Sequence, residues 1–385
     1  MANPAEPAAD LAAVLQRIAD QAAEHDADGS FPFDAFDALW EIGALNLTVP
    51  VDCGGQGRGL AASTEMVVAV GEADPSVALL LAQHLITHNN IRVGSWPVDM
   101  KRMVHRSSVE GVALINPLRV ERDLGTPARG GLPSTVAARL PDGRGWRLNG
   151  CKIYCTGIPI LRWLLVWART DDPEPLVGYF LVDANTAGIS VERTWDSLGM
   201  RATRSDDVTF ADVEIPVDHG VEISTVAAAA SGIDPVFAAW NGILMGAVYH
   251  GVARAARDWL AGYLNERIPS NLGAPLASLP RVQEAFGRIQ ALVSTGDRLL
   301  STTAADIDAA AESTAALDAN LVKLTVTNNA ITIVLDALRL VGNPGLFRSH
   351  PLERHLRNVL HGPVHTPQED SILVAAGRLA LQARS

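Results

Sequence analysis

Two histidines in short, proline-containing contexts are the residues best suited to chemistry in this chain. His361 lies in Leu360-His-Gly-Pro-Val364, and His84 follows Asp74-Pro-Ser-Val-Ala78. An imidazole titrates near neutral pH, so it can donate a proton or a hydrogen bond to a reacting group. Each also has a structural interpretation: His361 caps the end of a helix, and His84 is a core histidine bonded to a backbone carbonyl. At this point both interpretations stay open.

The cysteines offer less. The chain has three, Cys53, Cys151 and Cys155, so they cannot all pair, which fits a reducing compartment. Cys151 and Cys155 have too few nearby ligands to form a metal site, and we expect no bound metal.

The composition describes a large globular chain with an excess of acidic residues. Its 385 residues, 48% of them hydrophobic, are enough for two or three domains. The net charge of −12 argues against nucleic acid as a partner, because phosphates need a basic surface. Apolar runs such as Val77–Ala82 are too short to span a membrane, and the N-terminus lacks the features of a signal peptide. We therefore expect a cytoplasmic protein.

The hydrophobic pattern divides the chain into three regions that must position these residues. Helical spacing fills residues 1–109. Residues 110–220 contain short β segments, such as Trp163–Ala168, between Gly and Pro breaks. Long helical runs, such as 235–264, return over residues 221–385. The pattern predicts an α+β protein with an N-terminal helical domain, a middle β domain and a C-terminal helical bundle.

Several segments carry a resemblance to a known family. The segment from Trp195 to Ser205 resembles the W-x-x-x-G-x-R-x-[ST]-x-S block of the acyl-CoA dehydrogenase superfamily, and 48–57 resembles its P-x-x-x-G-G-x-G turn. Leu148-Asn-Gly-Cys-Lys-Ile-Tyr-Cys-Thr-Gly157 is similar to the family's flavin-contacting strand. The resemblance implies a β domain between two helical domains, with Tyr154 and Thr156 at the flavin ring. The alternative for Thr156 is a strand residue satisfied by its own sheet.

The usual catalytic base of this family is absent from its place. Acyl-CoA dehydrogenases commonly remove the substrate proton with a glutamate between the last helices, and that carboxylate must lie within hydrogen-bond reach. With Glu353-Arg-His-Leu-Arg-Asn358 as the reference, Thr366 falls where that glutamate stands. Glu369 and Asp370 follow it as candidates for a relocated base.

The same segment resembles another branch of the superfamily. Leu360-His-Gly-Pro-Val364 is similar to the L-H-[DG]-P-V block of flavin-dependent monooxygenases of the dibenzothiophene monooxygenase type. There a histidine helps to form and hold a flavin C4a-hydroperoxide. The resemblance implies this role for His361 and catalytic places for His84, for Thr156 near flavin N5, and for Asn116, which begins the Asn-Pro step before the flavin loop.

Two segments bear on how the flavin is held. Leu338-Arg-Leu-Val-Gly-Asn343 stands where the family has Q-x-x-G-G-N, so the glutamine is lost and Gly342 remains. Arg267 stands in the family's diphosphate loop, where it can pair with a phosphate; alternatively, it is a cation at a helix C-terminus. These changes suit FAD or FMN that arrives reduced from a separate flavin reductase and leaves after turnover. They also fit a degenerate family member.

Three functions remain open. The first is a reduced-flavin-dependent monooxygenase that hydroxylates a small apolar molecule with oxygen; the residues at positions 361 and 366 favour it. The second is an acyl-CoA dehydrogenase-like enzyme that oxidises an acyl thioester with FAD, using Glu369 or Asp370 as its base. The third is a non-catalytic scaffold without flavin. The resemblance and the long apolar helix faces imply a homotetramer, with no nucleic-acid or membrane partner.

Overall fold

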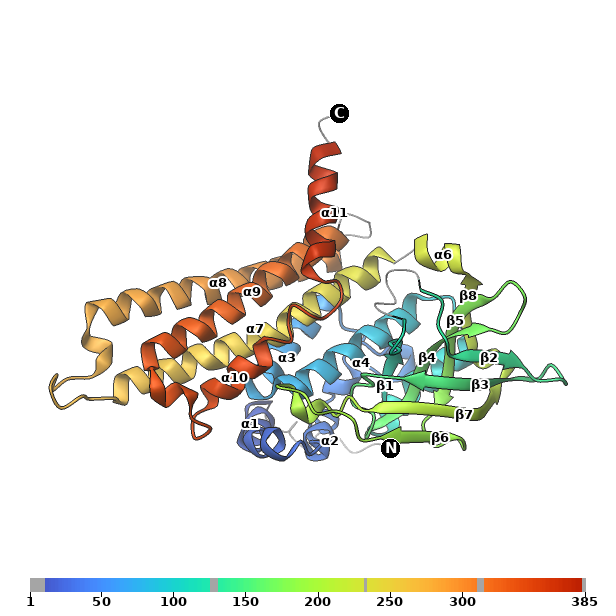
Figure 1. Cartoon of the computed structure of the whole chain (residues 1–385), viewed down its shortest axis with the longest axis horizontal. Coiled ribbons are helices and arrows are strands. Elements are labelled where there is room, and N and C mark those ends of the chain that lie inside the picture. The colour runs from blue at the N-terminus through green and yellow to red at the C-terminus, as the bar shows by residue number, and fades with distance from the viewer. Residues whose placement is uncertain (1–10, 125–130, 232–233, 310–314, 383–385) are drawn as a thin grey trace.

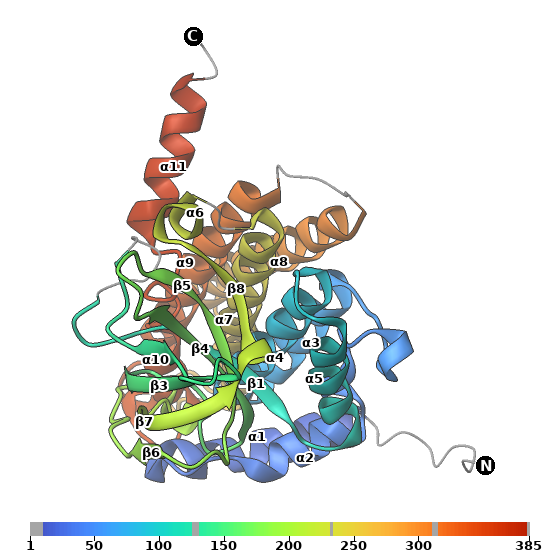
Figure 2. The ribbon, with the colours of Figure 1, turned by 90° about the vertical axis from the view of Figure 1, so that its right-hand side faces the viewer.

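The computed structural model describes residues 11–124, 131–231, 234–309 and 315–382. Figures 1 and 2 show N-terminal helices (blue), a twisted β-sheet (green) and long C-terminal helices (yellow to red) that lie against one another. The expected α+β fold, a β domain between two helical domains, is confirmed. The first ten residues, on which part of the argument against a signal peptide rests, lie outside the described residues.

The N-terminal domain is built around one almost completely buried helix, Pro75–Val93. Asp74 caps that helix by accepting a hydrogen bond from the Ser76 N–H, and Pro75 occupies its first position, where no N–H is needed. Because the helix is buried on nearly all sides, its sequence shows no single apolar stripe. The helices of this domain are α1 (Leu11–Asp28), α2 (Phe33–Glu41), α3 (Leu60–Ala73), α4 (Pro75–Val93) and α5 (Val98–Glu110).

The middle domain is one sheet with the strand order β6-β7-β3-β2-β4-β5-β8, and β1 pairs in parallel with β4. The strands are β1 (Leu114–Leu118), β2 (Val136–Arg139), β3 (Gly145–Lys152), β4 (Leu161–Thr170), β5 (Leu176–Asp183), β6 (Ile189–Glu192), β7 (Asp207–Pro216) and β8 (Gly220–Thr225). The domain boundary expected at residue 220 falls at the first residue of β8, so the sheet continues to Thr225.

The C-terminal domain is a bundle of long helices along the longest axis of the molecule, from which one helix projects (Figure 1). Its helices are α6 (Val226–Ser231), α7 (Pro235–Glu266), α8 (Pro280–Ala309), α9 (Ala315–Val341), α10 (Pro351–Val359) and the projecting α11 (Glu369–Gln382). Short 3-10 turns lie at Ala44–Asn46, Val51–Cys53, Arg201–Thr203, Val217–His219, Leu276–Ser278 and Asn343–Leu346.

Two helices of this bundle are long and apolar enough to cross a membrane. They are Pro235–Glu266 and Asp318–Val341, and their most apolar windows are 78% and 44% buried inside the protein. The same composition is expected of the core helices of a bundle, and α7 and α9 pack against each other here. Helix α4 packs against both α7 and β1, so it joins the three domains at the place where the candidate site lies.

Candidate active site

Four of the sequence-predicted residues line one cavity, which we call the seam cavity because it lies between the β domain and the helices. They are Asn116 on β1, Tyr154 and Thr156 after β3, and His361 after α10. The cavity has a volume of about 710 Å³, within the usual range for small-molecule and cofactor sites. Residues of α4 and α7 complete its walls, among them Gln83, Phe237, Asn241 and Met245.

A buried polar network holds the wall around Thr156. The Asn116 side chain donates from Nδ2 to the Thr156 carbonyl at 3.0 Å, and the Ser205 hydroxyl donates to Thr156 Oγ1 at 3.0 Å. Asn116 Oδ1 is buried and has no hydrogen-bond partner in the described part of the chain. Because buried acceptors are normally satisfied, this oxygen calls for a donor from a molecule inside the cavity.

Two aromatic rings lie at the same wall. Tyr154 has a φ of 56°, a left-handed conformation that is uncommon for a bulky residue and that clusters at functional sites. This backbone leaves the Tyr154 side chain 60% exposed, with its ring centroid 6.1 Å from that of Trp195. Both rings line the cavity and present flat apolar surface to its interior.

His361 lies in the turn that follows α10. Its Nε2 lies 3.2 Å from the Ser197 hydroxyl oxygen, and its ring centroid lies 6.3 Å from that of Trp195. Partial burial lowers the pKa of His361, so the imidazole is neutral at pH 7. The ring bonds Ser197 of the β domain, not a carbonyl of α10, so its placement does not support the helix-cap interpretation.

The segment after His361 is held from behind by α7 and α9. Lys323 on α9 donates to the carbonyls of His365 and Pro367, the latter at 2.7 Å. Asn241 on α7 donates to the Thr366 carbonyl at 2.8 Å. Burial lowers the pKa of Lys323 to about 8. These backbone contacts fix the position of the segment that carries His361.

The cavity contains no buried carboxylate among the described residues that line it. Thr366 lines the wall, whereas Glu369 and Asp370 lie in the first turn of α11 and are not part of the lining. The acidic residue in the described lining is Asp196, whose side chain is 96% exposed and lies 3.5 Å from Arg201. The charged residues of the described lining are therefore Arg119 and the exposed Asp196, and no carboxylate is buried beside His361.

The β domain meets α10 by direct backbone contact beside the cavity. A Cβ atom on Gly199 would lie 2.4 Å from the Arg357 carbonyl oxygen, which only glycine avoids. The Met200 N–H donates to Asn358 Oδ1 at 2.8 Å, and Arg357 donates to the Leu198 carbonyl at 3.0 Å. The stretch from Trp195 to Arg201 is thereby fixed against α10.

Three other sequence-predicted residues lie away from the seam cavity. His84 is fully buried behind β1: its Nε2 bonds the Leu45 carbonyl at 3.0 Å, and its Nδ1 accepts from the Ile115 N–H at 3.3 Å. Burial lowers its pKa to about 4. This placement matches the core-histidine interpretation and lends no support to a catalytic role.

Arg267 and Gly342 are exposed just beyond the C-terminal ends of α7 and α9, at the far end of the bundle (Figure 1).

Sequence reasoning missed several polar residues of the cavity, among them Ser197 and Asn241. Ser197 lies inside the Trp195–Ser205 block, so the motif contained it, although nothing marked its bond to His361. Asn241 lies on α7 among buried apolar residues. An amide within the apolar first half of a helix is a usable signal, because an amide removed from water needs partners.

Comparisons with known proteins agree with this geometry. The chain matches the N-terminal, middle and C-terminal domain models of the acyl-CoA dehydrogenases at residues 11–95, 121–213 and 243–368. YdbM of Bacillus subtilis (strain 168), which is named as an acyl-CoA dehydrogenase, is 32% identical over 93% of this chain and 93% of its own length.

Solved structures extend the likeness to another branch. KijD3, in a complex that contains FMN, is 28% identical, with a TM-score of 0.82 over 97% of this chain and 92% of its own. The dibenzothiophene monooxygenase TdsC of Paenibacillus sp. A11-2, bound to FMN, has the same fold, with a TM-score of 0.86 at 21% identity over 97% of this chain and 96% of its own. Neither branch is clearly closer, so the expected place next to the monooxygenases is not established. The chain belongs to the acyl-CoA dehydrogenase superfamily and is a flavin-dependent oxidoreductase of that family.

Proposed function

We propose that this protein is a reduced-flavin-dependent monooxygenase that hydroxylates a small, mostly apolar molecule. The observation that carries the proposal is the pairing of two positions in the seam cavity: His361 forms part of its wall, and Thr366 lines it where a dehydrogenase needs its carboxylate. A base that removes a substrate proton must reach that proton. The described lining offers no buried carboxylate for this task.

The cavity fits an isoalloxazine ring. Its volume is adequate, the Tyr154 and Trp195 rings supply flat surface, and Asn116 Oδ1 needs a donor such as a flavin N–H. Asn116, Tyr154, Thr156 and Trp195 would hold the ring. A reduced flavin supplies electrons to oxygen when it is bound there. FMN is present in the KijD3 and TdsC structures, which favours FMN here over FAD.

The chain's own residues supply a hydrogen-bond donor, limit the entry of water into the cavity and hold the His361 segment in position. The neutral imidazole of His361 can donate one N–H into the cavity while its other nitrogen faces Ser197. A wall without a buried carboxylate does not repel an anion that forms from oxygen, and apolar residues such as Phe237 and Met245 limit the access of water. Lys323 and Asn241 keep the His361 segment in place.

The dehydrogenase alternative makes an opposite prediction. An enzyme with a relocated base would reduce its flavin with an acyl thioester in the absence of oxygen. Incubation with FAD or FMN and butyryl-CoA under anaerobic conditions therefore separates the two functions. We expect no bleaching of the flavin absorbance; rapid bleaching that is lost in Glu369→Gln or Asp370→Asn would establish the dehydrogenase.

A second measurement places the chemistry on His361. After reduced FMN and protein are mixed with oxygen, the wild type should release hydrogen peroxide slowly, whereas His361→Ala should release it at least about tenfold faster, since a positioned donor contributes a factor of that order or more. His25→Ala is the matched control, because His25 makes a similar part-buried bond to Ser30 at 2.7 Å, outside the cavity lining. Equal peroxide rates in wild type and His361→Ala would remove the main support for the proposal.

We further propose that the protein works as a homotetramer, with oxygen as cosubstrate and a separate flavin reductase as the source of reduced flavin. Helix α11 projects from the body and leaves Leu373, Val374, Leu379 and Leu381 exposed, which suits burial against another subunit. Arg267 and Gly342 are not part of the lining of the cavity in their own chain. A neighbouring subunit would have to use them. Light scattering at micromolar concentration tests this assembly, and a monomer would contradict it.

A further inference from the structure

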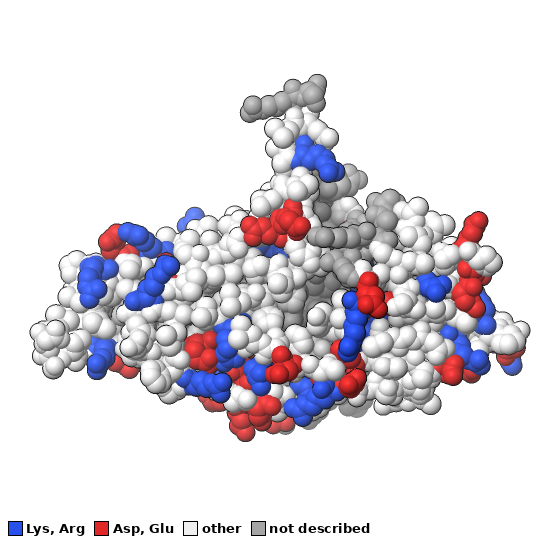
Figure 3. Space-filling view, in the orientation of Figure 1, with Lys and Arg blue, Asp and Glu red and all other residues white. Residues whose placement is uncertain are grey.

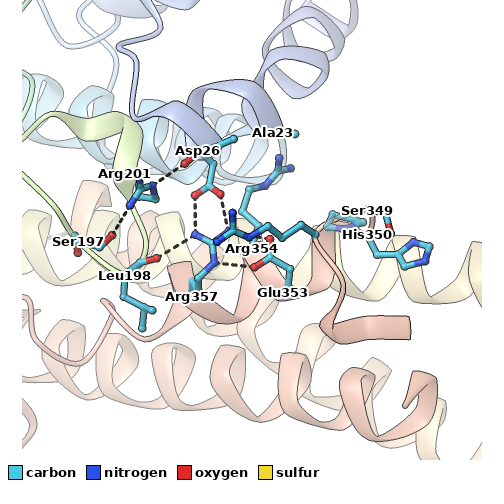
Figure 4. Close-up of a pocket in the computed structure, with 13 residues that line it drawn as sticks. Ala23, Asp26, Ser197, Leu198, Arg201, Ser349, His350, Glu353, Arg354 and Arg357 are labelled. Carbon is cyan, nitrogen blue, oxygen red and sulfur yellow. Dashed lines mark hydrogen bonds and ion pairs between the residues drawn. The ribbon is translucent and has the colours of Figure 1, made fainter. Parts of the chain in front are cut away.

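A second cavity lies on the other side of the stretch from Trp195 to Arg201, and we call it the arginine pocket. It has a volume of about 410 Å³ and lies between the end of α1, that stretch and the start of α10. Four arginines line it: Arg201, Arg348, Arg354 and Arg357. Figure 4 shows Arg201 and Arg357 converging on Asp26, with Arg354 beside them and His350 further to the right. Ser197 lines both this pocket and the seam cavity.

Two of the arginines are fully used by the protein. Arg357 pairs with Asp26 at 2.6 Å and with Glu353 at 2.8 Å. Arg201 donates to the backbone carbonyls of Asp26 at 2.7 Å and Ser197 at 3.2 Å. The Arg357–Asp26 pair joins α10 to α1, and the Arg201 contact with Asp26 joins the β domain to α1. These two side chains therefore stabilise the fold, and their charges also raise the local positive potential.

The other two arginines are available to a ligand. Within the described part of the chain, the side chains of Arg348 and Arg354 form no ion pair or hydrogen bond. The pocket therefore holds four guanidinium groups against two carboxylates, Asp26 and Glu353, in a chain whose net charge is −12. Figure 3 shows Lys and Arg (blue) mixed with Asp and Glu (red) along the lower edge, near α10 and α1. The pocket is a local cationic site on an acidic protein.

The start of α10 adds to this potential. Its N-cap residue, His350, makes no side-chain capping hydrogen bond, and Pro351 occupies the first helical position. The free N–H groups and the dipole at a helix N-terminus favour an anion, and guanidinium forks match the oxygens of a phosphate. We propose that the arginine pocket binds a phosphate-bearing small molecule through Arg348 and Arg354.

Two sources of this phosphate are compatible with the position of the pocket. One is the phosphate of a molecule whose other end occupies the seam cavity, since Ser197 lies at both. The other is a separate phosphate compound that binds only here. Both share the same recognition chemistry, and neither depends on whether the seam cavity performs a monooxygenation.

Calorimetric titration of the purified protein with inorganic pyrophosphate at low salt tests the site. We expect Arg348→Ala/Arg354→Ala to weaken binding at least about tenfold, because two charge-assisted contacts are lost. The matched control is Arg102→Ala/Arg106→Ala, which removes two exposed arginines of α5 that form no ion pair within the described residues. Circular dichroism shows whether each variant is folded, and Arg348→Lys/Arg354→Lys, which keeps the charge, should retain part of the affinity.

Titrations with FMN and riboflavin identify the source. If the flavin's own phosphate uses the pocket, the double alanine variant weakens FMN but not riboflavin. If FMN affinity is unchanged while pyrophosphate binding is lost, the ligand is a separate phosphate compound. The proposal is overturned if the wild type does not bind millimolar pyrophosphate, or if the pocket and control variants bind it equally. His361→Ala should bind pyrophosphate normally, so failure here is distinct from failure of the proposed function.

Discussion

The N-terminal helical domain and the seam cavity both contain histidines, but the surroundings of the rings differ. In the helical domain, His84, His88 and His105 form a fully buried cluster, with the Nδ1 atoms of His88 and His105 2.8 Å apart. Burial lowers the pKa of His84 and of His105 to about 4. At the seam, His361 faces a cavity and bonds one hydroxyl.

The contrast shows what a short motif can and cannot tell. His361 lies within a segment that resembles a monooxygenase block, and the same resemblance implies a catalytic place for His84. Both ring nitrogens of His84 bond backbone groups, whereas His361 bonds one side chain and faces space that a ligand can fill. A histidine becomes available for chemistry when one nitrogen is left to a ligand, and that depends on contacts remote in sequence.

The largest expected difference concerns stability. His84→Ala leaves the Leu45 carbonyl and the Ile115 N–H without their partner and opens a cavity, so we expect the free energy of unfolding to fall by about 3–5 kcal/mol. His361→Ala should cost less than about 1 kcal/mol, because its ring is part-exposed and makes one bond. Urea unfolding followed by circular dichroism measures both. Equal losses in the two variants would break the comparison.

The second prediction concerns acid. In the unfolded chain a histidine binds its proton near pH 6.5, whereas folding lowers the pKa of His84 and His105 to about 4 and of His355 and His365 to about 3. Between these values the unfolded state binds more protons. The contribution of these histidines to the free energy of unfolding should therefore be constant above pH 7 and fall steadily from pH 6.5 to 5. A flat profile over that interval, measured by urea titration, would mean that water reaches these four histidines in the folded protein.

A smaller effect is expected behind the seam. Lys323→Met keeps the length of the side chain but leaves two carbonyls, of His365 and Pro367, without a donor, at a cost of about 1–3 kcal/mol. The freed segment should also move His361, so peroxide release from reduced FMN should accelerate. Lys101→Met, which removes a lysine that donates to the carbonyls of Arg92 and Gly94 outside the cavity lining, is the control. Unchanged peroxide release in Lys323→Met would show that the segment does not need this support.

The smallest effect is expected at Ser197. Ser197→Ala removes the partner of His361 Nε2 and leaves the imidazole in place but less firmly oriented. Peroxide release should rise by about twofold to tenfold, and the unfolding free energy should fall by about 0.5–1.5 kcal/mol. Ser30→Ala, which removes the corresponding bond to His25, should leave peroxide release unchanged. A rise as large as that in His361→Ala would mean that the serine itself contacts the ligand.

Much of the architecture could be predicted because it depends on local sequence patterns. Periodicity separates the helical regions from the β region, and the motif blocks bring Asn116, Tyr154, Thr156 and His361 to one cavity. The sequence could not decide between the catalytic and the core-histidine interpretation of His84, since its partner Leu45 is remote in sequence. The arginine pocket was missed for the same reason: Asp26 and Arg357 meet only after the chain has folded.

The glycine at position 199 also bears on how ligands enter and leave. Its backbone touches the backbone of α10 with no side chain between them. Two packed main chains cannot slide apart without breaking the bonds of Met200 and Arg357 beside them. We therefore expect the β domain and α10 to stay together at this seam during turnover. Ligand exchange is then expected through another wall or by rotation of side chains such as Tyr154, and its rate should follow ring motion rather than domain motion.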